Sequence, residues 1–467
     1  MKTILIKNGI LVTMDKQRRI IEDGAVAIEK NKIVGVGKTR EITNNFKGDV
    51  VIDAKRKAIL PGFVNTHTHA ATVYLKGVTE DMPNALHKVL WPIKHLLTPD
   101  ILYDMGMLGM LELLKSGSTT VAENYNLLRM GGARASEKIG LRMLLSEQVI
   151  DVDLTKIDGG IKDGLYTYDD EIGDRTLEEA VKLIKEWNEK AEGRIRCMMG
   201  PLATDVCSKE ILEKARIEAE KLGVGLTIHC SQSPAEVKQV NKMYGKSPVQ
   251  FLKDIGYLGQ KLIATHCIYT SREDTKTLAD SGTKIAHCPS NMIIRGGNKM
   301  APQLHWFESG ITFGLGTDNP PSPHDMFVAM RSMRSVANRN LSNNEYESGL
   351  TKFFPNSMKT LEVATIGGAK VLGMEDKIGS IEVGKFADII TVNIKNPHIG
   401  PTNNGLVTNI VNYMNGSDVE DVIIDGYLVK ERGTVKTVNE AEVVDKAYDT
   451  NQSLWTKFYE EYPELKQ

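Results

Sequence analysis

The sequence lacks the features of a membrane protein or a nucleic-acid-binding protein. None of its apolar runs reaches the roughly 20 residues that a membrane-spanning helix needs. The N-terminal stretch Met1 to Ile6 soon turns polar and has no signal-peptide core. The formal net charge is -2, so there is no excess of basic residues to bind a phosphate backbone. We therefore expect a cytoplasmic protein with no membrane or nucleic-acid partner.

Cysteine is also scarce. The chain has five cysteines and no CxxC pair, which excludes a disulfide framework and suits a reducing compartment. Cys230, Cys267 and Cys288 each directly follow a histidine. If each histidine points from a strand into a pocket, its neighbour points to the other face. We interpret these cysteines as packing residues, and thiolate ligation of a metal is the alternative.

The length and composition indicate a globular chain with more than one domain. The chain has 467 residues, of which 41% are hydrophobic and 25% charged. Short β-branched runs, separated by turns and uninterrupted by helical periodicity, fill the first 60 residues. Similar runs return near the C-terminus, where Gly379 to Val392 reads as turn, strand, turn, strand. We expect one β-sandwich domain built from residues 1–60 and 374–436.

Strands alternate with helices between the two β segments. The apolar strand candidates are Gly62 to Asn65, Thr119 to Glu123, Arg142 to Ser146, Ile195 to Gly200, Gly225 to His229, Leu262 to His266, Lys284 to His287 and Thr312 to Leu315. Eight strands with intervening helices fit a (β/α)8 barrel, the TIM barrel, within the α/β class. We therefore predict a barrel over residues 61–373 and a helical extension over 437–467.

Two histidines stand one residue apart after the apolar run Ala58 to Val64. Side chains at positions i and i+2 of a strand point the same way, so His67 and His69 would share one space. Neutral imidazole is a good ligand for zinc, iron or nickel. An isolated His-x-His pair is as often a chance pair of surface or core histidines, so this motif alone does not establish a metal site.

Three further candidate ligands also follow strand-like runs. His229, His266 and Asp318 stand at the ends of the fifth, sixth and eighth predicted strands. A barrel brings these ends together around one mouth, where its active site lies. Imidazoles and a carboxylate can hold a metal and leave room for a water, whose pKa the metal lowers towards neutrality. Asp318 could accept the proton of that water and return it to a leaving group, although an aspartate there could also cap a turn.

These stretches make the sequence similar to the amidohydrolase superfamily. It most resembles the branch of the s-triazine hydrolases (chlorohydrolases) and the 5-methylthioadenosine/S-adenosylhomocysteine deaminases. The resemblance rests on Pro61 to His69, Leu75 to Asp81, Thr265 to Cys267, His287 to Asn291, Leu315 to Asp318 and Gly379 to Ile390. It implies one zinc, or alternatively iron or nickel, held by His67, His69, His229 and Asp318. It also implies that His266 holds the hydrolytic water or the polarised substrate atom, and that the chain forms a homo-oligomer, a dimer.

One catalytic position departs from that branch. Its deaminases carry His-x-x-Glu on strand five, where the glutamate passes a proton to the ring nitrogen, whereas Gln232 stands at that position here. An amide cannot transfer a proton at neutral pH. Either Asp318 alone carries both proton transfers, or Glu123, His287 or Glu147 supplies the missing acid. The nearby Glu236 is interpreted as a first-turn helix residue.

Loop residues at the same strand ends are expected to bind the substrate. The candidates are Trp91, Glu123, Glu147, His287, Asn291 and Arg295. Two acidic groups near the mouth would favour a cationic or amine-bearing substrate. Lys94 follows Trp91-Pro92-Ile93 where the nucleoside deaminases place the acidic residue that grips the ribose. This difference counts against a methylthioadenosine or S-adenosylhomocysteine substrate.

We therefore predict a metal-dependent hydrolase that cleaves a carbon–nitrogen bond of a small nitrogen heterocycle and releases an amino or alkylamino group. One alternative is a cyclic-amide or halide-releasing hydrolase in which Asp318 alone carries the proton. The other alternative is a metal-binding scaffold without catalysis, which Gln232 leaves open.

Overall fold

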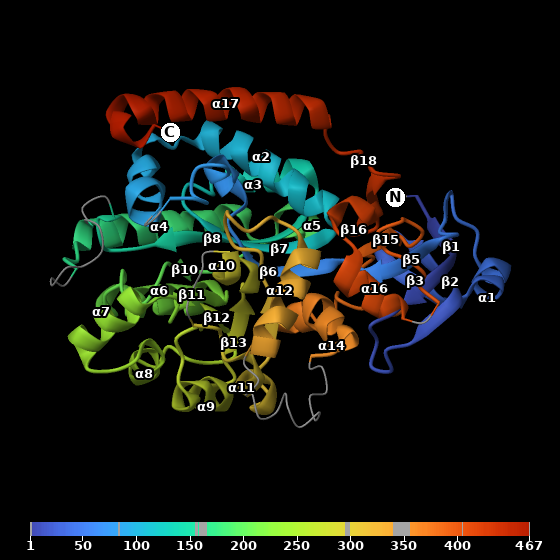
Figure 1. Cartoon of the computed structure of the whole chain (residues 1–467), viewed down its shortest axis with the longest axis horizontal. Helices are drawn as coiled ribbons and strands as arrows, with labels where there is room; N and C mark the ends of the chain where they lie inside the picture. The colour runs from blue at the N-terminus through green and yellow to red at the C-terminus, as the bar shows by residue number, and fades with distance from the viewer. Residues whose placement is uncertain are drawn as a thin grey trace.

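A barrel and a sheet domain make up the chain (Figure 1). The computed structural model describes residues 2–82, 85–154, 157, 166–294, 299–339, 355–403 and 405–466. Figure 1 shows the barrel elements filling most of the molecule, with the strands of both chain ends side by side beyond them.

Parallel strands form the barrel in two hydrogen-bonded arcs. The first arc contains β6 (Phe63–Thr68), β7 (Ser118–Tyr125), β8 (Arg142–Val149), β9 (Ile195–Cys197) and β10 (Gly200–Pro201). The second arc contains β11 (Leu226–Cys230), β12 (Leu262–His266), β13 (Lys284–His287) and β14 (Phe313–Leu315). Parallel bridges from Met199 to Leu226 and from Thr68 to Asp318 join the arcs. Because β9 and β10 occupy one strand position, this is the predicted eight-stranded (β/α)8 barrel.

Helices connect the strands, and side chains or glycines cap several of their ends. The helices are α2 (Pro99–Lys115), α3 (Gly132–Ile139), α4 (Asp170–Trp187), α6 (Lys209–Leu222), α7 (Pro234–Tyr244), α8 (Pro248–Asp254), α9 (Arg272–Ser281), α11 (Gln303–Glu308) and α12 (Met326–Arg339). Thr98 caps α2 by accepting a hydrogen bond from the Ile101 N–H at 3.3 Å. Gly223 ends α6 at a φ of 72°, a left-handed conformation that glycine adopts without steric cost.

The C-terminal helix α17 (Glu440–Glu461) lies along the barrel over α2 (Figure 1). Trp455 Nε1 donates a 2.9 Å hydrogen bond to the carbonyl of Tyr74, and Thr450 Oγ1 donates one of 2.6 Å to Asp104. Tyr74 belongs to η1 (Ala70–Leu75), the short helix directly after His69. The terminal helix therefore secures the segment that follows the first histidine pair.

Strands from both chain ends build the sheet domain. Nine strands form one sheet: β1 (Ile4–Val12), β2 (Ile20–Glu29), β3 (Lys32–Lys38), β4 (Val50–Asp53), β5 (Lys57–Pro61), β15 (Ile389–Asn393), β16 (Val419–Ile424), β17 (Tyr427–Glu431) and β18 (Thr434–Val435). Eight of them follow one hydrogen-bonded path, and β4 lies off it, paired with β1. The N-terminal β5 pairs antiparallel with the C-terminal β15. The two ends share an aliphatic core that includes Ile6, Ile28, Ile389 and Ile423.

A buried ion-pair cluster joins the two bodies. Arg142, at the start of β8, donates hydrogen bonds of 2.8 and 3.1 Å to Asp388 and one of 3.0 Å to Asp425. All three side chains are buried. A buried guanidinium needs such partners because an unpaired charge in the interior is costly.

Two local predictions were wrong. The first 60 residues contain a short helix, α1 (Thr39–Asn45), where no helix was expected. Within Gly379 to Val392 only the second expected strand forms, as β15. The first expected strand makes single contacts instead, such as the 2.7 Å bond from the Ile381 N–H to the Thr13 carbonyl. Both segments are too short for periodicity to decide their conformation.

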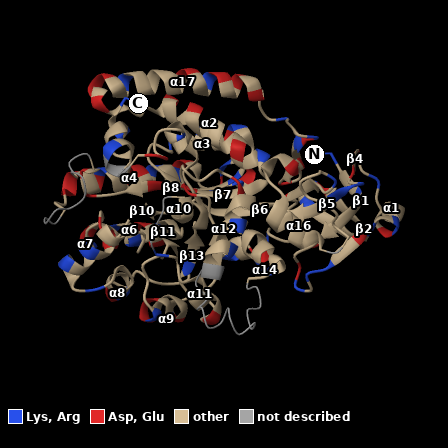
Figure 2. Ribbon diagram, viewed as in Figure 1, with Lys and Arg blue, Asp and Glu red and all other residues tan. Residues whose placement is uncertain are grey.

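The surface carries both signs of charge. Figure 2 shows basic and acidic residues mixed over the outer helices in this view. Within the described part of the chain, every helix is too short or too polar to cross a bilayer.

Candidate metal centre and pocket

Four histidines and one aspartate meet at the C-terminal ends of the barrel strands. The ring centroid of His67 lies 4.7 Å from that of His69, 4.8 Å from that of His229 and 5.7 Å from that of His266. Ligand atoms of His67, His69 and His229 lie within 4.8 Å of one another, as do those of His67, His266 and Asp318. The structure thus brings together the strand-end residues that the sequence singled out.

The histidines are held in the form that binds a cation. Nδ1 of His229 is hydrogen bonded to the Leu202 carbonyl at 2.5 Å, and Nδ1 of His69 to the Asn124 carbonyl. These bonds place the ring protons on Nδ1 and leave Nε2 as the ligand atom. Burial and the neighbouring His67 lower the pKa of His69 to about 3, so its imidazole is neutral. Nε2 of His67 is buried with no hydrogen-bond partner. A cation would satisfy that nitrogen, so these residues fit a divalent metal.

Asp318 is the carboxylate of the cluster. Its Oδ1 lies 3.5 Å from His69 Nε2 and 3.7 Å from His67 Nε2, and its Oδ2 lies 3.9 Å from His266 Nε2. Burial acts to raise its pKa, but the surrounding histidines outweigh that effect and hold it well below the usual value. Asp318 is therefore ionised at neutral pH, and its carboxylate could serve as an anionic ligand and proton acceptor.

Buried hydroxyls and one amide form a hydrogen-bond network that holds the backbone carbonyl of Asp318. Asn65 Nδ2 donates to Thr317 Oγ1 at 2.8 Å, Thr317 Oγ1 to Thr68 Oγ1 at 3.2 Å, and Thr68 Oγ1 to the Asp318 carbonyl at 3.1 Å. Partners of this kind fix the orientation of metal ligands. No pattern in the sequence distinguished these residues from ordinary strand-end polar residues.

The chain bends sharply where the strands deliver these side chains. Ser231, His266, Cys267 and Asp318 all adopt positive φ values, between 50° and 75°. Such values are uncommon for residues other than glycine and cluster at functional sites. All five cysteines, Cys267 included, are free and buried, and the ligand groups found in the described residues contain no cysteine.

A cavity of about 370 Å³ opens above the cluster of four histidines and Asp318, here called the metal cluster. Of the predicted residues, those that line it are Trp91, Gln232, Asn291, His69, His229, His266 and Asp318. Asn291 is itself held by hydrogen bonds from Nδ2 to the carbonyl and side-chain oxygens of Asn319, at 2.9 and 2.8 Å. The cavity is large enough for a small heterocycle.

Glu123 and Glu147 do not line this cavity, which corrects the prediction that they bind substrate or supply an acid. Glu123 is 1% exposed and accepts the Ala70 N–H through both carboxylate oxygens, at 3.0 and 2.8 Å. Glu147 accepts the N–H groups of Leu127 and Leu128. Burial raises the pKa of Glu123 to about 8 and that of Glu147 to about 7. Both carboxylates therefore hold loops in place instead of forming an acidic mouth.

His287 also lies outside the cavity wall. Its ring packs edge-on against Trp306, with centroids 5.1 Å apart, and is 1% exposed. Burial lowers its pKa to about 3, so it is a neutral packing residue and not an acid. The remaining candidate, Arg295, lies outside the described residues.

Two carboxylates near Gln232 carry roles that the sequence analysis missed. Glu236 stands in the first turn of α7, as expected, but it is fully buried and accepts the N–H groups of Ser231 and Gln232 at 2.8 and 2.7 Å. It thereby holds the loop that follows His229. Asp205 lines the cavity, and burial raises its pKa to about 6. Its position after β10 could have marked it as a candidate strand-end residue.

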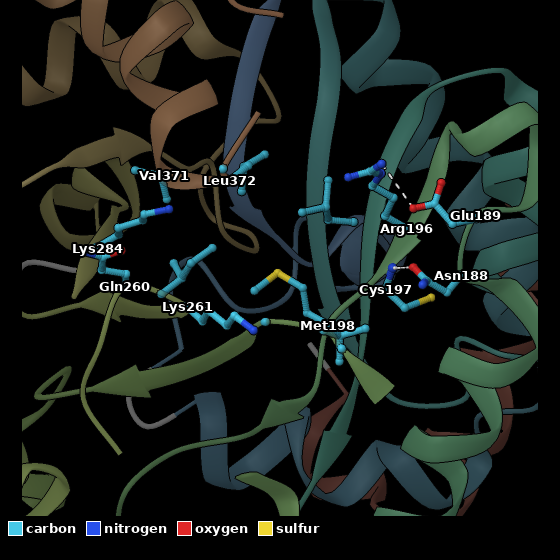
Figure 3. Close-up of a pocket in the computed structure, with 16 residues that line it drawn as sticks. Asn188, Glu189, Arg196, Cys197, Met198, Gln260, Lys261, Lys284, Val371 and Leu372 are labelled. Atoms are coloured by element: carbon cyan, nitrogen blue, oxygen red, sulfur yellow. Dashed lines mark hydrogen bonds and ion pairs between the residues drawn. The ribbon is translucent and has the colours of Figure 1, made fainter. Parts of the chain in front are cut away.

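A second cavity, of about 250 Å³, lies at the opposite ends of the strands (Figure 3). Its wall includes Lys261 and Lys284, at the starts of β12 and β13, and an ion pair of 3.1 Å between Arg196 and Glu189. None of the residues of the metal cluster lines it.

Known proteins share this fold and cover nearly the whole chain. The sequence model described as the amidohydrolase family matches residues 58–429. A 5-methylthioadenosine/S-adenosylhomocysteine deaminase of Desulforudis audaxviator is 36% identical over 92% of this chain and 95% of its own length. A 5'-deoxyadenosine deaminase of Methanosarcina mazei is 34% identical over 97% of this chain and 99% of its own.

Solved structures agree with the sequence matches. An adenosine deaminase from Xanthomonas campestris with bound zinc superposes with a TM-score of 0.85 at 26% identity, over 97% of this chain and 98% of its own. An atrazine chlorohydrolase from Arthrobacter aurescens complexed with zinc gives 0.82 at 24% identity, over 96% of this chain and 100% of its own, a likeness of fold.

Proposed function

Because this chain belongs to the amidohydrolase family, we propose that it is a metal-dependent hydrolase that releases an amino or alkylamino group from a small nitrogen heterocycle. The observation that carries the proposal is the His67, His69, His229, His266 and Asp318 cluster at the base of the cavity. Four imidazoles and one carboxylate favour zinc, although iron or nickel would also accept them.

Each side chain of the cluster has a proposed role. His67, His69, His229 and Asp318 would hold a divalent cation, which would lower the pKa of a bound water towards neutrality. Asp318 accepts the proton of that water, because its carboxylate is ionised and within reach of the cluster. His266 directs Nε2 into the same space and holds the water or the polarised ring atom. A new carbon–oxygen bond forms, the carbon–nitrogen bond breaks, and the amine leaves with the proton that Asp318 returns.

Two proton routes fit the cavity. In the first, Asp318 alone serves both steps, since Gln232 lines the cavity and its amide only donates or accepts hydrogen bonds. In the second, Asp205 supplies the acid to the ring nitrogen. It is the only carboxylic acid besides Asp318 among the described lining residues, and its pKa of about 6 suits proton exchange near neutrality.

The two alternatives predicted from the sequence are a cyclic-amide or halide-releasing hydrolase and a scaffold without catalysis. The first shares the metal centre and differs in the leaving group. The scaffold without catalysis is disfavoured because a substrate in the cavity would reach the whole cluster except the buried His67.

The decisive experiment combines elemental analysis with a screen for ammonia, amine and halide release from aminated purines, pterins, pyrimidines and triazines. One bound divalent metal and ammonia or amine release support the proposal. Halide release alone would favour the halide-releasing alternative, and a metal-loaded protein that hydrolyses nothing would favour the scaffold. Loss of turnover in Asp205→Asn would select the second proton route, and retained turnover the first.

The homodimer and the cytoplasmic location stay predictions. Light scattering coupled to size-exclusion chromatography tests the first, and fractionation of the source cells tests the second.

A further inference from the structure

We infer that Lys94 binds an anionic substituent, a carboxylate or a phosphate, of the heterocyclic substrate. The inference rests on the proposed function, because it concerns the substrate of the same cavity. It replaces the expectation of a cationic substrate, which depended on Glu123 and Glu147 facing the mouth.

Lys94 lies in the wall of the cavity that contains the metal cluster. It belongs to the short helix η3 (Pro92–Leu96) and lines the same cavity as Trp91, His69 and His266. Its Nζ donates a 3.1 Å hydrogen bond to the neutral amide oxygen of Gln148. The ammonium therefore lies at the cavity wall and not out in solvent.

The bond to Gln148 ties this cation to the metal centre. Gln148 Nε2 donates 3.3 Å hydrogen bonds to the carbonyl and side-chain oxygens of Asn124. The Asn124 carbonyl in turn holds Nδ1 of His69. A chain of hydrogen bonds thus fixes Lys94 relative to a ligand of the metal, which suits a residue that orients a substrate over it.

No carboxylate of the described residues forms an ion pair with Lys94. Among the described residues, none comes within the 4.0 Å of Nζ that defines an ion pair. The nearby Glu147 acts to raise the pKa of Lys94, but its carboxylate oxygens accept hydrogen bonds from the N–H groups of Leu127 and Leu128. The Tyr125 ring lies below the ammonium, with its centroid 5.5 Å from Nζ. A partly buried cation without an anionic partner is costly, and a substrate anion would complete the site.

The remaining charges of the cavity agree with this assignment. Lys299 lines its rim as a second cation, with Nζ 5.2 Å from the centroid of the Tyr269 ring. Outside the metal cluster, Asp205 is the one opposing carboxylate among the described lining residues. Burial lowers the pKa of Lys94 to about 8, so its ammonium is retained at neutral pH.

The test uses pairs of ligands that differ by one anionic group. Adenosine is compared with 5'-AMP for the phosphate, and pterin with pterin-6-carboxylate and cytosine with 5-carboxycytosine for the carboxylate. Binding to the metal-loaded protein is measured by calorimetry and turnover by ammonia release. The variants are Lys94→Gln, the charge-keeping Lys94→Arg, the rim variant Lys299→Gln, and Lys185→Gln on the exposed face of α4 as the matched control.

The wild-type protein should prefer the anionic member of at least one pair. Lys94→Gln should reduce that preference about 10- to 100-fold, as expected for loss of one charged hydrogen bond. Lys94→Arg should keep most of it, Lys299→Gln should change it less, and Lys185→Gln should leave it unchanged at equal metal content. The inference is overturned if the wild type binds no anionic member better than its neutral partner, or if Lys94→Gln keeps the preference. Selective binding without any turnover would instead contradict the proposed function.

Discussion

Replacing Glu236 by alanine tests how the loop after His229 is held. The carboxylate is fully buried and accepts the N–H groups of Ser231 and Gln232 at 2.8 and 2.7 Å, together with the hydroxyl of Thr204. Ser231 adopts a φ of 52°, so the loop depends on these bonds to keep a conformation that its sequence does not favour.

The expected loss follows from the two backbone donors. Each buried N–H left without an acceptor costs about 1–3 kcal/mol, and a water entering the space left by the side chain recovers part of this. We therefore expect Glu236→Ala to lower the free energy of unfolding by about 2–4 kcal/mol. Because the loop positions His229, metal affinity should also fall about 10- to 100-fold.

Urea unfolding of the metal-loaded protein and competition with a chelator measure the two effects. Glu210→Ala is the matched control, because Glu210 is an exposed first-turn glutamate of α6 whose helix-dipole contribution is only about 0.3–1 kcal/mol. If Glu236→Ala costs no more than this control and leaves metal affinity unchanged, Glu236 is merely a first-turn residue and the reasoning is refuted.

Four further outcomes are expected. Asp318→Asn should lower turnover by about 100-fold or more, since the amide accepts no proton; near-normal turnover in a variant with full metal content would contradict this role. Gln232→Glu should raise turnover on aminated heterocycles about 100-fold if the pocket is a deaminase site that lacks only the proton-transferring glutamate. The same substitution should leave turnover unchanged if Asp205 already supplies that proton. Arg142→Met should lower the free energy of unfolding by about 3–5 kcal/mol in urea, because Asp388 and Asp425 would stay buried without their cation; a loss below 1 kcal/mol would show that these carboxylates are not dependent on it. Lys94 loses its proton as the pH rises through about 8, and Glu147 and Tyr125 are its titratable neighbours. The kcat/KM for an anionic substrate should therefore fall between about pH 7 and about pH 9 relative to that for its neutral partner. Parallel pH profiles for the two substrates would exclude a role of Lys94 in binding the anionic group.

The sequence was sufficient for the barrel and for the meeting of the metal-binding side chains. Apolar runs give strand positions, and the C-terminal ends of barrel strands meet around one mouth, so His67, His229 and Asp318 could be expected to lie close together. The loops could not be predicted in the same way. Whether Glu123 faces the cavity or the Ala70 N–H depends on the path of η1, which no periodicity encodes.

The contrast between predictable strand ends and unpredictable loops explains why carboxylates were the least predictable part of the site. A loop that leaves a strand end exposes backbone N–H groups with no partner in the sheet, and a buried carboxylate satisfies two of them at once. Glu147 and Glu236 each hold a loop in this way, and Glu123 holds one through the single N–H of Ala70; burial raises the pKa of all three. Among the described residues, this leaves Asp318 and Asp205 as the carboxylates that reach the cavity, beside the Lys94 ammonium, which forms no ion pair with either. We therefore expect the buried glutamates to shape the mouth by holding its loops, and the Lys94 ammonium to determine which substituents the cavity accepts.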